Sequence, residues 1–151
     1  MTFLVLLFGL GLGWVPFPQA LAYGNCPPEM NSRAESLLVD ARRNWSSLFK
    51  HQRVFSSCDD GELGEGYSEA VVNLFAKRWD QFGTFFALAK KNHEFQNWAI
   101  RHIDATASDD DLNRIILNSN SCINNAAAEK LCKVIRQGAA NALMESERVR
   151  R

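Results

Sequence analysis

The sequence predicts an all-α fold: a single bundle of five or six helices after an N-terminal signal segment. Apolar residues recur three and four positions apart through most of the chain, as they do on one face of a helix. No stretch alternates between apolar and polar residues as a half-buried strand would. The segments between the periodic stretches are short, and we see no repeat and no low-complexity linker. These observations favour helices packed on helices.

The first 22 residues, MTFLVLLFGLGLGWVPFPQALA, are typical of a cleaved secretory signal. An almost unbroken apolar run from Phe3 to Val15 leads to an A-x-A site that ends at Ala22. One feature departs from the signal pattern, because no Lys or Arg precedes this run. The run is also shorter than the ~20 apolar residues of a transmembrane helix. We expect cleavage after Ala22, one helical domain over residues 23–151, and a periplasmic or extracellular location. The alternative is an uncleaved membrane anchor, which would be the only link to a membrane.

Residues 32–52 are predicted to form the first helix. Its apolar face consists of Ala34, Leu37, Leu38, Ala41, Trp45, Leu48 and Phe49. A proline pair precedes it, and Asn31 or Ser32 can cap its start. The glycosylation sequon that begins at Asn44 falls inside this helix, so we interpret it as accidental.

Five more helices are predicted after it. They cover residues 63–78, 80–91, 93–103, 109–116 and 126–143. The glycine-rich stretch before the first of them leaves its start open, either near Glu62 or at Ser68. Asn92 can cap the helix that follows it. Ser108 followed by three aspartates is a strong helix start, because acids favour the positive end of the helix dipole.

The charge balance argues against nucleic acid as a partner. The chain has 17 basic and 17 acidic residues, and its net charge is zero. A general nucleic-acid binder would show an excess of basic residues.

Four cysteines predict two disulfides in an exported chain. Cys122 lies a few residues before the last helix and Cys132 about two turns inside it, so a folded-back linker can join them. Cys26–Cys58 follows by elimination. We expect strain in this pair, because the two cysteines flank one long predicted helix. The spacings match no zinc site, and the sequence predicts neither a metal nor a cofactor.

The run CDDGELGEGYSEAVV, residues 58–72, is the most distinctive in the chain. It lacks the alternating ligands of a calcium loop and the strand and glycine order of a dinucleotide fingerprint. On a helix, Glu62, Glu65 and Glu69 lie on one side without a basic partner in the pattern. A solvated helix face is one interpretation, and a patch that binds a basic partner is the other. The glycines indicate a closely packed neighbouring helix or a loop.

His102 and Asp104 form a second candidate site, as a base and its orienting group. Two residues apart on a helix, they point about 200° apart, so they can meet only if the helix ends at His102. Otherwise His102 suits the negative end of the helix and Asp104 shapes the turn. A third candidate is the group of aromatic residues in the middle of the chain, which we expect mainly in the core.

The stretches CDDGELGEGYSEAVVNL and WAIRHIDATASDDDLNRI resemble small exported helical proteins of bacteria with no assigned activity. The resemblance covers about residues 58–132. It implies a periplasmic or secreted helical protein, and it adds no catalytic residue.

We therefore expect a non-enzymatic, exported protein that binds another, basic protein, as inhibitor and immunity proteins do. The candidate binding residues are Glu62, Glu65 and Glu69. One alternative is a small hydrolase that uses these carboxylates together with His102. Another is a carrier of an apolar ligand between helices.

Overall fold

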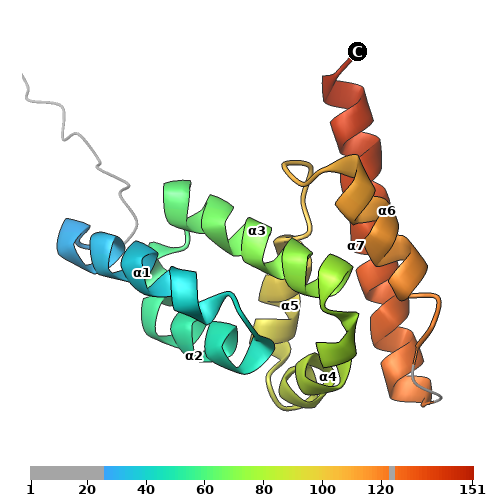
Figure 1. The fold of residues 1–151 in the computed structure, drawn as a ribbon, viewed down its shortest axis with the longest axis horizontal. Coiled ribbons are helices and arrows are strands. Elements are labelled where there is room, and N and C mark those ends of the chain that lie inside the picture. The colour runs from blue at the N-terminus through green and yellow to red at the C-terminus, as the bar shows by residue number, and fades with distance from the viewer. Residues whose placement is uncertain (1–25, 123–124) are drawn as a thin grey trace, which may run out of the picture.

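The computed structural model describes residues 26–122 and 125–151, so the predicted signal at residues 1–22 lies outside the described residues. The described part contains α-helices, two short 3-10 helices and no strand, which confirms the all-α prediction. The helices are α1 (Pro28–Ala41), α2 (Trp45–Phe55), α3 (Gly61–Lys77), α4 (Phe82–Lys91), α5 (His93–Arg101), α6 (Asp109–Asn118) and α7 (Ala126–Val149). Helix α3 lies between the α1–α2 pair and the α6–α7 pair (Figure 1).

The prediction of one helix over residues 32–52 was wrong, because the chain turns after Ala41 and starts a second helix at Trp45. Asn44 causes this restart. Its backbone is extended, and its side chain accepts a hydrogen bond from the Ser47 amide at 2.9 Å. Asparagine is among the strongest N-cap residues, so the sequon that we interpreted as accidental contains a helix cap.

The α1–α2 hairpin also explains the Cys26–Cys58 disulfide. The two Cα atoms are 4.8 Å apart. Because the hairpin brings its two ends together, no linker has to fold back along a 21-residue helix as we had expected. Cys122 and Cys132 form the second disulfide, with Cα atoms 6.4 Å apart. Both predicted pairings are present, and they indicate a non-cytoplasmic environment.

Helix α3 begins at Gly61 and not at Ser68. Gly61 has a φ of 52°, and the Asp60 side chain accepts a hydrogen bond from the Gly61 amide at 2.8 Å. Within the helix, a Cβ atom on Gly66 would lie 2.7 Å from Cδ2 of Leu38 in α1. The close approach of a neighbouring helix therefore explains this glycine.

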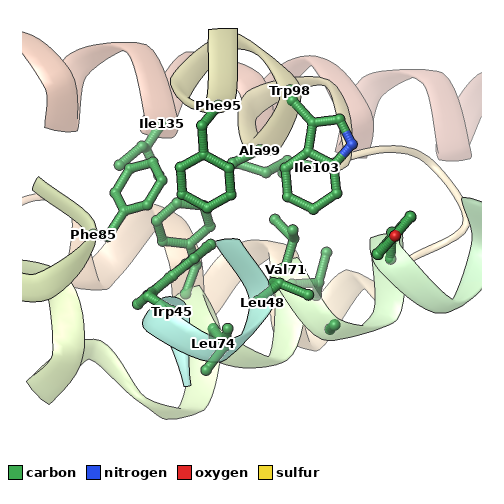
Figure 2. Close-up of a cluster of buried hydrophobic side chains, with 14 of the residues drawn as sticks. Trp45, Leu48, Val71, Leu74, Phe85, Phe95, Trp98, Ala99, Ile103 and Ile135 are labelled. Carbon is green, nitrogen blue, oxygen red and sulfur yellow. The ribbon is translucent and has the colours of Figure 1, made fainter. Parts of the chain in front are cut away.

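The core contains buried residues from all seven helices. Trp45 is fully buried, and its ring centroid lies 4.6 Å from that of Phe75 and 4.5 Å from that of Phe85. Figure 2 shows this region, in which Phe95 and Trp98 of α5 point toward the side chains of α2 and α3. Most of the central aromatic residues are thus in the core, while Trp79 and Phe86 are only partly buried.

Of two predicted helix caps, the one at Ser108 is confirmed and the one at Asn92 is wrong. Ser108 caps α6 as expected, since its hydroxyl accepts a hydrogen bond from the Asp111 amide at 3.2 Å. Asn92 occupies the N-cap position of α5, but its side chain makes no capping hydrogen bond. Among the described residues, no helix has the length and apolar character needed to cross a membrane.

Candidate functional site

The three predicted glutamates lie on α3, and all three side chains are exposed. They do not form an unpartnered stripe. Glu69 lies 3.4 Å from Arg42 of the α1–α2 turn, with 71% of the glutamate and 47% of the arginine side chain exposed. A pair this exposed contributes little to stability, because water screens it. The two glutamates Glu65 and Glu69 line a common hollow, whereas Glu62 lines a separate one beside Cys58.

The hollow beside Glu65 and Glu69 has a volume of about 470 Å³ and lies between α3 and the segment that joins α5 to α6. Thr106 and Ala107 of that segment line it, as does Asp111 of α6. Lys77 is the basic side chain in its lining, and it lies 3.3 Å from Asp111. The exposed face of α3 therefore carries more acidic than basic groups at this point.

A network of polar side chains lies at the end of α5 next to this hollow. We call it the His102 cluster, and it consists of Asp59, Ser68, Trp98, His102 and Asp104. His102 Nε2 is 3.1 Å from Asp59 Oδ2, and His102 Nδ1 is 3.0 Å from the Ser68 hydroxyl. The Ser68 hydroxyl is also 2.6 Å from Asp104 Oδ2, and the Trp98 indole donates to Asp59 Oδ2 at 2.8 Å.

Counting protons fixes the direction of each bond. The Ser68 hydroxyl has one proton, and it donates this proton to Asp104, because an ionised carboxylate only accepts. His102 Nδ1 must then donate to the Ser68 oxygen, while Nε2 donates to Asp59. All of these bonds form together only when both ring nitrogens carry protons, so the geometry fits a cationic His102 between two carboxylates.

The two carboxylates are held in their ionised form. Burial alone would raise the pKa of Asp59, but the hydrogen bonds from His102 and Trp98 outweigh it, and the pKa is lowered. Burial likewise opposes ionisation of Asp104, whose pKa is lowered by hydrogen bonds from Ser68 and Thr106. Asp59 Oδ1 is buried and has no hydrogen-bond partner among the described residues. Asp59 therefore joins the cluster through Oδ2 alone, and its other oxygen stays unsatisfied within the described part of the chain.

Asp59, His102 and Ser68 are linked in the order of a serine-hydrolase triad, yet their surroundings do not fit a nucleophile. Ser68 is only 5% exposed, and its proton is engaged by Asp104. Its own amide lies in the interior of α3, where helical bonds use it, so it is not free to stabilise an oxyanion. We conclude that the cluster attaches the end of α5 and the following turn to α3.

The sequence-predicted pair is therefore connected indirectly. Helix α5 ends at Arg101 with His102 as its C-cap, so the helix stops within one residue of the end that the hypothesis required. Even so, His102 reaches Asp104 only through the Ser68 hydroxyl. Asp104 also accepts from the Thr106 amide at 2.9 Å, which is the turn-shaping role of the alternative interpretation. Sequence reasoning missed Asp59 and Ser68, since no local spacing connects positions 43 and 34 residues away from His102.

The alternative functions find partial support at most. Glu65 and His102 line the same open hollow, as a carboxylate hydrolase would need, but neither Glu62 nor Glu69 lines it. Charged side chains line the hollows along α3, whereas a carrier of an apolar ligand needs an apolar cavity. Within residues 26–122 and 125–151, no group of three His, Cys, Asp or Glu side chains could hold a metal ion.

No family model, no curated protein and no solved structure matches this chain.

Proposed function

We propose that this chain is an exported, non-enzymatic helical protein that binds a basic partner protein through the acidic face of α3. The acidic face is defined by Glu62, Glu65 and Glu69. The observation that supports this most directly is the hollow beside Glu65 and Glu69, where exposed carboxylates adjoin a concave surface.

Exposure favours binding over catalysis at these glutamates. General acid–base catalysis uses a carboxyl group whose pKa is shifted toward the working pH, which usually requires burial. Exposed charges at the rim of an interface act mainly on the rate of encounter and on partner choice. The glutamates of the acidic face are exposed in this way, so we expect them to act in binding.

Export is supported by the two disulfides and by the predicted signal, whose residues lie outside the described part of the chain. An inhibitor or immunity role rests on analogy with proteins of this size and compartment. The mass of the exported protein tests the signal: a chain beginning at Tyr23 is expected, and one retaining Met1 would contradict it.

The test of the binding function is a charge-neutralised variant, Glu62→Gln/Glu65→Gln/Glu69→Gln. A partner co-purified with the parent from the native host should associate more slowly with this variant at low salt, and with less salt dependence. The matched control, Glu94→Gln/Glu129→Gln/Glu147→Gln, removes three exposed acids elsewhere and should associate as the parent does. Equal association rates for parent and α3 variant would refute the proposed function.

A further inference from the structure

A groove of about 430 Å³ lies between the α4–α5 turn and the first turns of α7. Helices α4 and α5 lie beside this part of α7 in Figure 1. The volume is within the ~300–1,000 Å³ range of pockets that hold small molecules. None of the residues that line the groove belongs to α3, so it is separate from the acidic face. We call it the α4–α7 groove.

Part of the lining is apolar. Phe86 of α4 lines the groove together with Leu131 and Val134 of α7. Phe86 is only partly buried, and Val134 is 40% exposed. The Phe86 ring stacks on that of Phe82, with centroids 6.3 Å apart, so it is held in place. A bound apolar group would remove the exposed surface of Phe86 and Val134 from water, which is favourable.

The rest of the lining is basic. Lys90 of α4 and Lys130 of α7 line the groove, and both side chains are exposed. Neither lysine forms an ion pair with another described residue. His93 also lines the groove, and one nitrogen of a neutral imidazole can donate a hydrogen bond. No described aspartate or glutamate lines it, since Glu94 and Glu129, next to two lining residues in sequence, are not part of the lining.

Two helix N-termini add to the positive charge of the groove. Helix α5 begins at His93, and α7 begins one residue before Ala127, which also lines the groove. The N-terminus of a helix has a partial positive charge, and the side chain of Asn92 makes no capping bond at the start of α5. The negative C-terminus of α4 lies here too. Two lysines in its last turn offset that charge, and the Asn92 amide bonds to the carbonyls of Leu88 and Ala89.

The basic side chains beside α3 are less available to an anion. Arg42 is paired with Glu69, and Lys77 is paired with Asp111. An anion that bound to them would have to replace these pairs. The lysines of the α4–α7 groove have no such competitor among the described residues, so charge complementarity favours an anion at this groove.

We propose that the α4–α7 groove binds a small amphiphilic carboxylate. The carboxylate group lies at Lys90 and Lys130, and the apolar body covers Phe86 and Val134. An inorganic anion would leave the apolar lining exposed, and a neutral apolar molecule would leave both lysines without a partner. Ala127 and Val134 lie two turns of α7 apart, roughly 10 Å along the helix axis, so the groove suits a short alkyl or aromatic body. This site is distinct from the acidic face and does not depend on the proposed function.

The test uses octanoate as the probe, titrated into the isotope-labelled, disulfide-intact protein and followed by the amide signals. Acetate has the carboxylate without the apolar body, and 1-octanol has the apolar body without the charge. Octanoate should bind about tenfold more tightly than either of them, because only octanoate is matched by both parts of the lining. Its largest shifts should fall in residues 86–96 and 127–134.

Two variants separate the contributions of charge and apolar surface. The substitution Lys90→Gln/Lys130→Gln should weaken octanoate binding about fivefold and leave 1-octanol unaffected. The matched control Lys50→Gln/Arg114→Gln removes two exposed charges elsewhere and should bind octanoate as the parent does. Val134→Glu places a carboxylate beside the apolar body and should abolish octanoate binding. Val134 is an exposed helical residue, so this variant should keep the helical circular dichroism of the parent.

Several outcomes would overturn the proposal. Equal affinity for octanoate and acetate would mean that the apolar lining contributes nothing, and equal affinity for octanoate and 1-octanol would mean the same for the lysines. Unchanged octanoate binding in the lysine variant, or shifts confined to residues outside the groove, would also contradict it. None of these results bears on the acidic face, which the α3 glutamate variant tests separately.

Discussion

Two histidines lie close to the Tyr67 ring, and they have different hydrogen-bond partners. The Tyr67 ring centroid is 5.6 Å from that of His51 and 5.8 Å from that of His102. His51 lies 2.9 Å from the Tyr67 hydroxyl through Nδ1 and 2.9 Å from the Ala34 carbonyl through Nε2. His102 is held instead between the Ser68 hydroxyl and the carboxylate of Asp59.

The partners of His51 require a neutral ring. The carbonyl of Ala34 can only accept, so Nε2 carries the proton. Burial and the nearby charge of Asp59 raise the pKa of Tyr67, so its hydroxyl stays protonated and donates to Nδ1. Burial also lowers the pKa of His51 itself, against the effect of the Ala34 hydrogen bond.

The consecutive residues Tyr67 and Ser68 thus offer two histidines different sets of hydrogen-bond partners. The Tyr67 hydroxyl donates to His51 and the Ala34 carbonyl accepts from it, which fits a neutral ring. Around His102, the Ser68 oxygen and the Asp59 carboxylate both accept, which fits a ring that donates from both nitrogens. The two histidines therefore differ in how many of their ring nitrogens face a hydrogen-bond acceptor: one in His51 and two in His102.

The largest effect that separates the two sites should come from His51→Ala. This change leaves a cavity and two unsatisfied buried groups, on Tyr67 and Ala34, so we expect a loss of about 3 kcal/mol in the free energy of unfolding. Denaturant unfolding measures it. The control Tyr67→Phe removes only the hydroxyl and should cost about 1 kcal/mol.

The substitution His102→Ala should have a smaller effect, of about 2 kcal/mol, because Asp59 keeps its bond from Trp98 and Ser68 keeps its bond to Asp104. The exposed His93→Ala is the matched control and should change stability by less than about 0.5 kcal/mol. A larger loss for His102→Ala than for His51→Ala would contradict the comparison.

Acid should destabilise the protein by protonating Asp59 and Asp104, the two carboxylates of the His102 cluster. The pKa values of Asp59 and Asp104 are lowered in the folded state, so their stabilisation is complete above the unfolded value, near pH ~4. It is lost as the pH falls through the folded values. Unfolding midpoints between pH 5 and pH 2 should therefore fall more steeply in the parent than in Asp59→Asn. The exposed Asp110→Asn serves as the control.

The smallest effect should be the pH dependence contributed by His51. Its lowered pKa means that the unfolded chain takes up a proton below about pH 6.5 while the folded protein does not. Stability should therefore decrease as the pH falls from 7 to 5.5. The variant His51→Gln, which does not titrate, should show a flatter dependence over this range, and an equal slope in both proteins would contradict this assignment.

Sequence periodicity predicted the fold class and most helices, because each helix buries one apolar face. It did not predict the break at Asn44, since the apolar spacing of Ala41, Trp45 and Leu48 continues across the turn. The second helix starts at Trp45 because the Asn44 side chain accepts a hydrogen bond from the Ser47 amide. In the sequence, only the residue type of Asn44 indicates this cap.

The candidate site was predictable only in part. The exposed glutamates follow from helical spacing, but the pairing of Glu69 with Arg42 depends on how α1 and α2 turn back beside α3. The contacts of His102 with Ser68 and Asp59 depend on tertiary packing, which brings the end of α5 against α3. Local sequence contains no information on either.

The Cys26–Cys58 disulfide has a mechanical consequence. It joins the residues that flank the α1–α2 hairpin, which are 32 positions apart. Tension applied between the two ends of the chain would pass from Cys26 directly to Cys58, so the hairpin would bear no load while the bond is intact. This bond alone should shorten the contour length of the stretched, oxidised protein by roughly 110 Å, at ~3.5 Å per bypassed residue. A reductant should restore that length together with the roughly 35 Å bypassed by the Cys122–Cys132 bond, whose residues are 10 positions apart.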